Sequence, residues 1–248
     1  MATVHLLGTG AGLSDGSRTT TMLAFESAGS VIVVDCGGDV VQRLQASGVE
    51  LDRIEAMVIT HEHPDHVSGF PLFVEKIWLS GRRRPIPVYG PAPALSQARR
   101  VFEAFDTSGW TGMPEILWRE VALEEGAPVL EEGPWRITAA PGRHSVPVIA
   151  LRVEDRAGGG VAAYSADTEP VDTVERLARG AGLLVHEATG AFGGHTGMED
   201  AAALAARAGA GRLVLVHLPP DARDEQLGEA RRAFERTELG ADGARYDF

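Results

Sequence analysis

The stretch that decides the fold is Met57-Val58-Ile59-Thr60-His61-Glu62-His63-Pro64-Asp65-His66. It begins with apolar residues, as a buried strand does, and its last six residues contain three histidines and one aspartate. Imidazole and carboxylate groups are suitable ligands for Zn²⁺ and similar divalent ions. In a tight loop after a strand, alternate side chains can face one centre while the others face a second. A histidine-rich surface loop is the alternative, but the preceding apolar run and the following Gly69 favour a metal site.

The composition of the chain is that of a globular protein. It has 248 residues, of which 44% are hydrophobic and 23% charged, so disorder and fibrous structures are disfavoured. No apolar stretch approaches the roughly 18–20 residues that span a bilayer, and we expect no membrane partner. The single cysteine, Cys36, excludes an intramolecular disulfide, and a cytoplasmic location is the simplest expectation. A net charge of −12 argues against general binding to nucleic acids.

Short β-rich runs recur along the chain, and several are apolar throughout, as in strands covered on both faces. The predicted strands are Thr3–Leu7, Met22–Glu26, Val31–Asp35, Ala56–Thr60, Ile86–Tyr89, Trp135–Ala139, Val148–Val153, Val161–Ser165, Leu183–His186 and Arg212–His217. The predicted helices are Val40–Gln45, Pro170–Arg179, Glu199–Ala208 and Glu225–Thr237. The segment from Phe70 to Trp118 is less regular and could form a cap over a site, an interface, or both. Interspersed strands and helices predict an α/β sandwich, with residues 1–248 as a single domain.

The loop from His61 to His66, here called the metal loop, resembles the His-x-His-x-Asp-His signature of the metallo-β-lactamase superfamily. Three later residues match the remaining metal ligands of that family in chain order, namely His144, Asp167 and His217. Asp35 matches an aspartate that supports the metal loop by hydrogen bonding. The resemblance covers almost the whole chain. It implies a four-layer αββα sandwich with its site at one edge, between the two sheets.

The same resemblance implies that seven residues hold two metal ions. The expected ligands are His61, His63 and His144 for one ion, Asp65, His66 and His217 for the other, and Asp167 as a bridge. Two divalent ions roughly 3.5–4 Å apart acidify water, so the expected nucleophile is a hydroxide between them. Asp65 is also expected to take part in catalysis. Redox di-iron relatives carry glutamate at the position of His63, so zinc is expected, although manganese is also compatible with these ligands.

Two further motifs resemble the ribonuclease Z branch of the superfamily. His186-Glu187-Ala188-Thr189 resembles its His-Glu-Ala-Thr motif, and the segment from His195 to Ala201 resembles its His-Ser-Thr-x-x-x-Ala motif. There the histidine faces the scissile phosphate and the glutamate orients it. The resemblance thus implies that His195 is a general acid or phosphate stabiliser and Glu187 its partner. The alternative is an exposed, idle His195 with Glu187 as a capping or surface carboxylate.

The chain also departs from that branch. Ribonuclease Z carries a long arm that grips transfer RNA between the third histidine and the bridging aspartate, whereas here only Ser145 to Ala166 intervene. The early Pro-x-Lys-x-Arg-Asn loop of the branch appears as Ser14–Thr19 and keeps only Arg18. Transfer RNA is therefore not the expected substrate. The cluster Arg82-Arg83-Arg84 could contact a phosphate, but a solvated, interface or loop-anchoring role is equally open.

These features predict a metal-dependent phosphodiesterase that acts on a small-molecule or single-stranded phosphodiester. Two other activities stay open, because a fold alone does not fix a reaction: hydrolysis of a carboxylic ester, thioester or lactone, and ribonuclease Z-type RNA 3′-end cleavage. A non-enzymatic metal-binding domain is disfavoured, since no expected ligand is missing. Helical spacing of Phe70, Phe73, Ile77 and Trp78 within Gly69–Gly81 is compatible with a homodimer, although burial inside one chain explains it as well.

Overall fold

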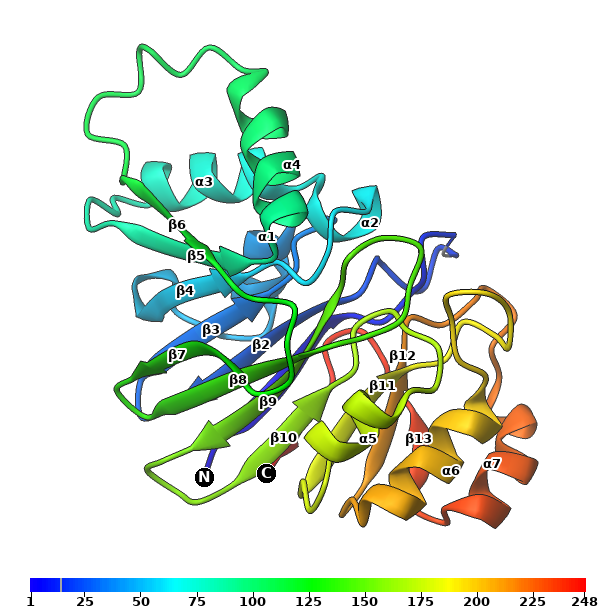
Figure 1. Cartoon of the computed structure of the whole chain (residues 1–248). Helices are drawn as coiled ribbons and strands as arrows, with labels where there is room; N and C mark the ends of the chain where they lie inside the picture. Colours follow the sequence, from blue (N-terminus) through cyan, green and yellow to red (C-terminus); the bar gives the residue numbers. More distant parts are fainter. Residues whose placement is uncertain (14) are drawn as a thin grey trace.

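Two seven-stranded sheets pack face to face (Figure 1). The computed structural model describes residues 1–13 and 15–248, so Ser14, the first residue of the early loop quoted above, lies outside the described residues. The first sheet has the order β14-β1-β2-β3-β4-β5-β6. Its strands are β1 (Thr3–Gly8), β2 (Met22–Ser27), β3 (Ser30–Val34), β4 (Ile54–Val58), β5 (Ile86–Gly90), β6 (Ile116–Glu120) and β14 (Arg245–Asp247).

The second sheet has the order β13-β12-β11-β10-β9-β8-β7. Its strands are β7 (Ala127–Glu132), β8 (Trp135–Pro141), β9 (Ile149–Asp155), β10 (Val161–Tyr164), β11 (Leu183–Glu187), β12 (Leu213–Val216) and β13 (Thr237–Leu239). The helices are α1 (Val40–Ala46), α2 (Pro64–Val67), α3 (Phe70–Leu79), α4 (Ala92–Glu103), α5 (Asp172–Leu177), α6 (Met198–Ala208) and α7 (Gly228–Ala233). Short 3₁₀ turns cover Leu51–Arg53 and Asp224–Leu227.

Three apolar cores separate the layers. One core fills the space between the sheets, a second lies under α1, α3 and α4, and a third lies under α5, α6 and α7 (Figure 1). Strand β12 shows why its residues are apolar throughout: Val214 and Val216 face the core between the sheets, while Leu213 and Leu215 face the helices. This arrangement confirms the predicted αββα sandwich.

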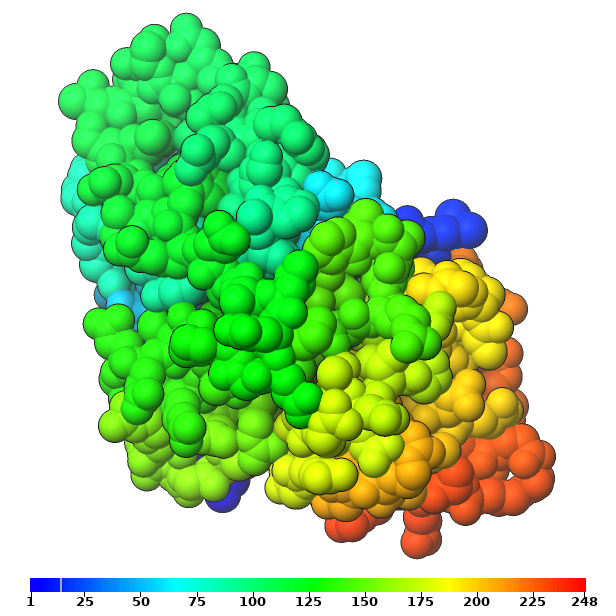
Figure 2. Space-filling model, viewed as in Figure 1, coloured from blue at the N-terminus to red at the C-terminus, as the bar shows by residue number. Residues whose placement is uncertain are grey.

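The direction of the strands brings the predicted site together. Strands β3 to β6 run parallel, and so do β10 to β13. Parallel strands end at the same edge of a sheet, and ligands bind beyond that edge. Asp35 follows β3, the metal loop follows β4, Asp167 lies beyond β10, and His217 follows β12. Figure 2 shows the early loop (blue) at this edge, between the chain after β4 (cyan) and the chain after β11 (yellow).

The segment from Phe70 to Trp118 is more regular than predicted. It contains α3, β5, α4 and β6, and therefore extends the first sheet and its outer helical layer. Its tryptophans pack within this layer, since the rings of Trp78 and Trp110 stack 4.9 Å apart and Trp118 lies 5.5 Å from Phe70. Phe70, Phe73 and Ile77 are buried inside the same chain, which accounts for their helical spacing. A homodimer therefore stays a prediction.

Other boundaries also differ from the sequence-based ones. The helix predicted over Glu225–Thr237 is wrong in its second half: α7 ends at Ala233, and Thr237 begins β13 because it pairs with Leu213. Strands β7 and β14 were not predicted. Between His144 and Asp167 the chain contains only β9, β10 and the glycine-rich turn that joins them, as expected. Within residues 1–13 and 15–248, no helix is both long and apolar enough to cross a membrane.

The turn between β2 and β3 offers a test of backbone strain. Ala28 and Gly29 both have positive φ angles, 48° and 78°, as a two-residue type I′ hairpin requires. Alanine adopts this conformation at a cost that asparagine largely avoids. We expect Ala28→Asn to raise the free energy of unfolding by about 0.5–1 kcal/mol in denaturant titrations. Ala46→Asn, at an exposed position of α1, is the control and should give no gain, because its backbone is already right-handed.

Candidate metal centre

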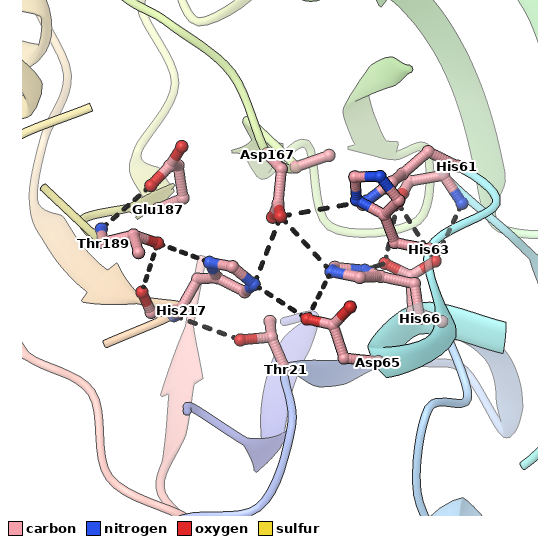
Figure 3. A network of polar contacts seen from close by, with 12 residues as sticks. Thr21, His61, His63, Asp65, His66, Asp167, Glu187, Thr189 and His217 are labelled. Atoms are coloured by element: carbon pink, nitrogen blue, oxygen red, sulfur yellow. Dashed lines mark hydrogen bonds and ion pairs between the residues drawn. The ribbon is translucent and has the colours of Figure 1, made fainter. Parts of the chain in front are cut away.

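Three histidines form the first group of ligands. His61 and His63 lie on the loop after β4 (Figure 3), and His144 lies on the loop between β8 and β9. Nε2 of His144 is 3.1 Å from Nδ1 of His63, and one ligand atom from each of the three residues lies within 4.8 Å of the others. His61 is fully buried, whereas the other two are partly exposed. The structure therefore brings together the three residues predicted for one metal ion.

The second group contains two aspartates and two histidines. Ligand atoms of Asp65, His66, Asp167 and His217 also lie within 4.8 Å of one another. Nε2 of His217 is 3.2 Å from Oδ2 of Asp65, and Nε2 of His66 is 3.5 Å from the same oxygen. Three of these residues are buried, and only Asp65 is partly exposed. This is the set predicted for the second ion.

Asp167 lies between the two groups. Its Oδ2 is 3.2 Å from Nε2 of His217 and 3.5 Å from Nε2 of His66, both in the second group. The same oxygen is 3.8 Å from Nε2 of His61 in the first group. This central position matches the bridging role predicted from the sequence (Figure 3).

Several buried polar atoms of these groups have no hydrogen-bond partner among the described residues. Nε2 of His61, Nε2 of His66 and Oδ1 of Asp167 are inaccessible to solvent and make no hydrogen bond to any described residue. Leaving such atoms unpaired in a protein interior costs free energy, and buried charges normally pair or coordinate metals. The nitrogen and carboxylate atoms thus fit divalent cations at this position.

The electrostatics of the groups agree with a cation site. Burial and the neighbouring His66 hold the pKa of His61 well below its usual range, which keeps its imidazole neutral and able to ligate. Burial alone would raise the pKa of Asp167. The neighbouring imidazoles of His217 and His66 outweigh that effect and hold the pKa well below the usual range, so Asp167 is a carboxylate.

Four of the five candidate ligand histidines use Nδ1 for a hydrogen bond and leave Nε2 for the centre. His66 donates to Asp35 over 2.9 Å, and His144 donates to the carbonyl of Gly194 over 2.7 Å. His61 and His217 have threonine partners, Thr60 and Thr189, at 3.1 and 2.5 Å. Outer hydrogen bonds of this kind fix the tautomer and the ring orientation of metal ligands.

The two threonines work in the same way. The hydroxyl of Thr60 donates to the carboxylate of Asp35, and the hydroxyl of Thr189 donates to the carbonyl of His217. Each hydroxyl proton is thereby engaged, so the oxygen accepts the Nδ1–H of the ligand histidine. Sequence reasoning did not assign these threonines a role. Their positions in the sequence could have indicated it, since Thr60 directly precedes His61 and Thr189 is the last residue of the His-Glu-Ala-Thr motif.

Asp35 connects the first sheet to the metal loop. Its buried carboxylate accepts from the backbone and hydroxyl of Thr60, at 2.8 and 2.9 Å, and from His66. The next turn of the chain must also approach the loop closely, because a Cβ on Gly37 would lie 1.7 Å from the carbonyl oxygen of Asp65. The supporting role predicted for Asp35 thus corresponds to defined hydrogen bonds.

Backbone strain is concentrated where strands deliver side chains to the centre. Asp35, Ala166 and His217 have φ angles of 60°, 51° and 52°, in the left-handed region that non-glycine residues seldom adopt. Each lies just beyond a strand, and each is a ligand, a support of a ligand, or the neighbour of one. Such conformations persist only where the surrounding structure enforces them.

Glu187 and His195 form a pair beside the ligands. The fully buried carboxylate of Glu187 accepts from Nδ1 of His195 over 3.0 Å and from the backbone amides of Thr168, Thr189 and Thr196. The ring of His195 stacks on that of His217, with centroids 5.6 Å apart. Burial alone would lower the pKa of His195, but the hydrogen bond to Glu187 and its charge raise it above the usual value. Glu187 is therefore not a surface group, and His195 is only partly exposed.

The remaining candidates from the sequence lie outside this centre. His186 is buried and donates from Nδ1 to the carbonyl of Glu187, whereas His5 pairs with Glu26 over 2.9 Å. Arg82 is buried and donates to the backbone carbonyl of Ile54 at the start of β4 and to those of Arg84 and Pro85 just before β5. It therefore anchors the loop that leads into β5. Cys36 is buried, and burial raises the pKa of its thiol well above the usual value.

The ligands open into a cleft of about 420 Å³. His63, Asp65, Asp167, His195 and His217 all line it, so four of the candidate ligands and the histidine of the Glu187–His195 pair face one space. A cleft of this size accommodates a small organic ligand. The arrangement can therefore present metal-activated water and a proton donor to one bound molecule.

We expect Asp35→Asn to weaken metal binding by about 10–100-fold, because the amide cannot accept as strongly from both Thr60 and His66. Competition with a chromophoric chelator measures this affinity directly. Asp39→Asn is the matched control, since asparagine also caps α1 and Asp39 does not contact the ligands. Equal affinity of the Asp35→Asn variant and the unchanged protein would show that Asp35 does not orient the ligand.

The comparisons with known proteins agree with this geometry. Residues 31–218 match the family described as "Beta-lactamase superfamily domain". A ribonuclease Z from Mycolicibacterium paratuberculosis is 32% identical, over 98% of this chain and 96% of that protein. The metallo-β-lactamase fold protein YhfI from Bacillus subtilis has a TM-score of 0.82 at 25% identity, over 99% of this chain and 98% of that one.

A further structural neighbour is the short form of human tRNase Z, with a TM-score of 0.81 at 23% identity over 99% of this chain and 98% of that one. Its identity is low enough that the likeness concerns the fold alone. The family match covers most of the chain, and the relative from Mycolicibacterium covers nearly all of it. The chain therefore belongs to the β-lactamase superfamily, in the group of metallo-β-lactamase-fold proteins that includes ribonuclease Z.

Proposed function

We propose that this protein is a metal-dependent phosphodiesterase. The observation that carries the proposal is the Glu187–His195 pair, joined over 3.0 Å, whose histidine faces the same cleft as four of the proposed metal ligands. The curated relatives named ribonuclease Z support the same class of reaction. When bound, two divalent ions would activate water and polarise a phosphoryl oxygen.

The seven residues identified above would hold the ions. Five histidine nitrogens and two carboxylates suit zinc, and they also accept manganese. We propose zinc as the metal and two ions per chain, because the ligand atoms divide into two groups that share Asp167. Asp65 would bind the second ion at the open side of the cleft, where it is the most exposed member of its group.

His195 would act as the general acid. Glu187 accepts the proton on Nδ1, so the other ring nitrogen is free to face a substrate in the cleft. Cleavage of a phosphodiester releases an alkoxide that needs a proton, and a protonated imidazole supplies one near neutral pH. The raised pKa of His195 keeps more of its imidazolium present at a given pH.

RNA 3′-end cleavage is the second candidate function. It is favoured by the 32% identity to a ribonuclease Z over nearly the whole of both chains. The prediction that transfer RNA is not a substrate receives no support from the comparisons, since the relatives that align over nearly the whole chain are named ribonuclease Z. The argument against transfer RNA is still the short connection between β9 and β10, because it leaves no room there for the long arm with which ribonuclease Z binds transfer RNA.

We also propose that residues 1–248 form one domain. The core between the sheets contains residues from β1 to β12, and β14 near the end of the chain pairs with β1. A homodimer is also proposed. On α3 only the exposed side chains of Leu72 and Leu79 support it, because Phe70, Phe73, Val74 and Ile77 are buried in their own chain.

The primary test is a substrate panel on protein loaded with zinc or manganese. We expect turnover of bis(p-nitrophenyl) phosphate, and a His195→Ala variant with unchanged metal content should lose about 10²–10⁴-fold in kcat. A short RNA with a 3′ extension tests the second candidate. Turnover confined to lactones or thioesters, with no phosphodiester cleaved, would falsify the proposal.

The pH dependence tests the pairing with Glu187. An acid must be protonated, so activity should fall as the pH rises through the pKa of His195. Glu187→Gln removes the charge that raises this pKa, and the alkaline limb of the kcat profile should therefore move to lower pH. Glu169→Gln is the matched control, because Glu169 binds the amide of Gly194 on the same loop without contacting His195. Identical alkaline limbs in the two variants would contradict the assignment.

A further inference from the structure

Two large apolar side chains are exposed at the mouth of the metal cleft. Leu13 is 77% exposed and Phe192 is 57% exposed, and both line the cleft together with Pro219 and Pro220. A single exposed apolar side chain is ordinary on a protein surface. Several beside a charged, metal-ligating centre form an apolar wall, and such patches mark binding sites.

The ring of Phe192 is placed by its own backbone. It lies against Gly190, where a Cβ would come within 2.9 Å of the ring. The amide of His195 donates to the carbonyl of Phe192 over 2.9 Å, so both side chains project from one short turn. Their ring centroids are 5.0 Å apart. A group bound on Phe192 would therefore lie next to the proton donor.

The cleft has few means of binding a polyanion other than the metals. The described residues that line it include no lysine or arginine. Binding along a nucleic-acid backbone depends on such cations. Bound metal ions and His195 would contact the phosphate, and the apolar wall would contact the remainder of the substrate.

We propose that Phe192, with Leu13 on the rim, binds a flat aromatic ring attached to the scissile phosphodiester, either a nucleobase or a simple aryl group. This inference rests on the proposed function and adds the class of substrate. Stacking on an exposed aromatic side chain is the usual way to hold a base without reading its sequence. The cleft volume of about 420 Å³ has room for a ligand the size of a nucleotide.

Calorimetric titration of the zinc-loaded protein with three phosphate monoesters tests this inference without turnover. The probes are thymidine 5′-monophosphate, phenyl phosphate and ribose 5-phosphate, of which only the last lacks an aromatic ring. We expect the two ring-bearing probes to bind more tightly than ribose 5-phosphate. The ratio of the dissociation constant of ribose 5-phosphate to that of each ring-bearing probe measures this preference. Phe192→Ala should lower the ratio by about fivefold or more, and Phe192→Tyr should preserve it. Phe105→Ala, at an almost equally exposed phenylalanine outside the cleft, is the control and should leave the ratio of dissociation constants unchanged.

Equal binding of all three probes to the unchanged protein would overturn the inference. So would an equal loss of all three in Phe192→Ala, which would mean that the ring only supports the His195 turn. Tighter binding of thymidine 5′-monophosphate than of phenyl phosphate assigns a nucleobase, and the reverse or equality assigns a simple aryl group. Failure of the proposed function is a separate result, namely no phosphodiester turnover while the difference in binding persists.

Discussion

The candidate metal centre depends most on the hydrogen bonds accepted by the buried carboxylate of Asp35. It lies at the end of β3 and accepts hydrogen bonds from Thr60 and His66 on the neighbouring metal loop. Through Thr60 it also reaches His61, so one carboxylate orients one ligand in each of the two groups. A buried charge is tolerated only with such donors around it. Asp35 therefore couples the packing of the first sheet to the geometry of both groups.

Glu187 plays the corresponding part in the second sheet. It too is a fully buried carboxylate at a strand end, and it accepts from three backbone amides and from His195. The two sheets thus share the candidate site. The first sheet carries His61, His63, Asp65 and His66 on one loop, and the second carries His144, Asp167, His195 and His217. The cleft where these groups meet exists only when the sheets are packed face to face.

Sequence patterns predicted most of this centre because its residues carry local signals. Four ligands lie within six positions after an apolar strand, and the others occur in a recognisable order. The missed parts lack such signals. Strand β14 has three mostly exposed residues and is a strand only because it pairs with β1, while β6 is partly exposed and its apolar pattern is weak. Helix α4 begins with Ala92, Pro93 and Ala94 and reads locally as a turn. The exposed wall at Leu13 and Phe192 depends on tertiary placement, which no spacing reveals.

The positive φ angles of Asp35 and His217 create local frustration. Each position needs a specific side chain for the centre and a backbone conformation that such a side chain disfavours, so glycine cannot resolve the conflict. The local sequence alone therefore opposes the final geometry, and the surrounding structure must hold these two residues in place. The backbone conformation of the centre is thus a property of the completed sandwich and not of the short segments that carry its residues.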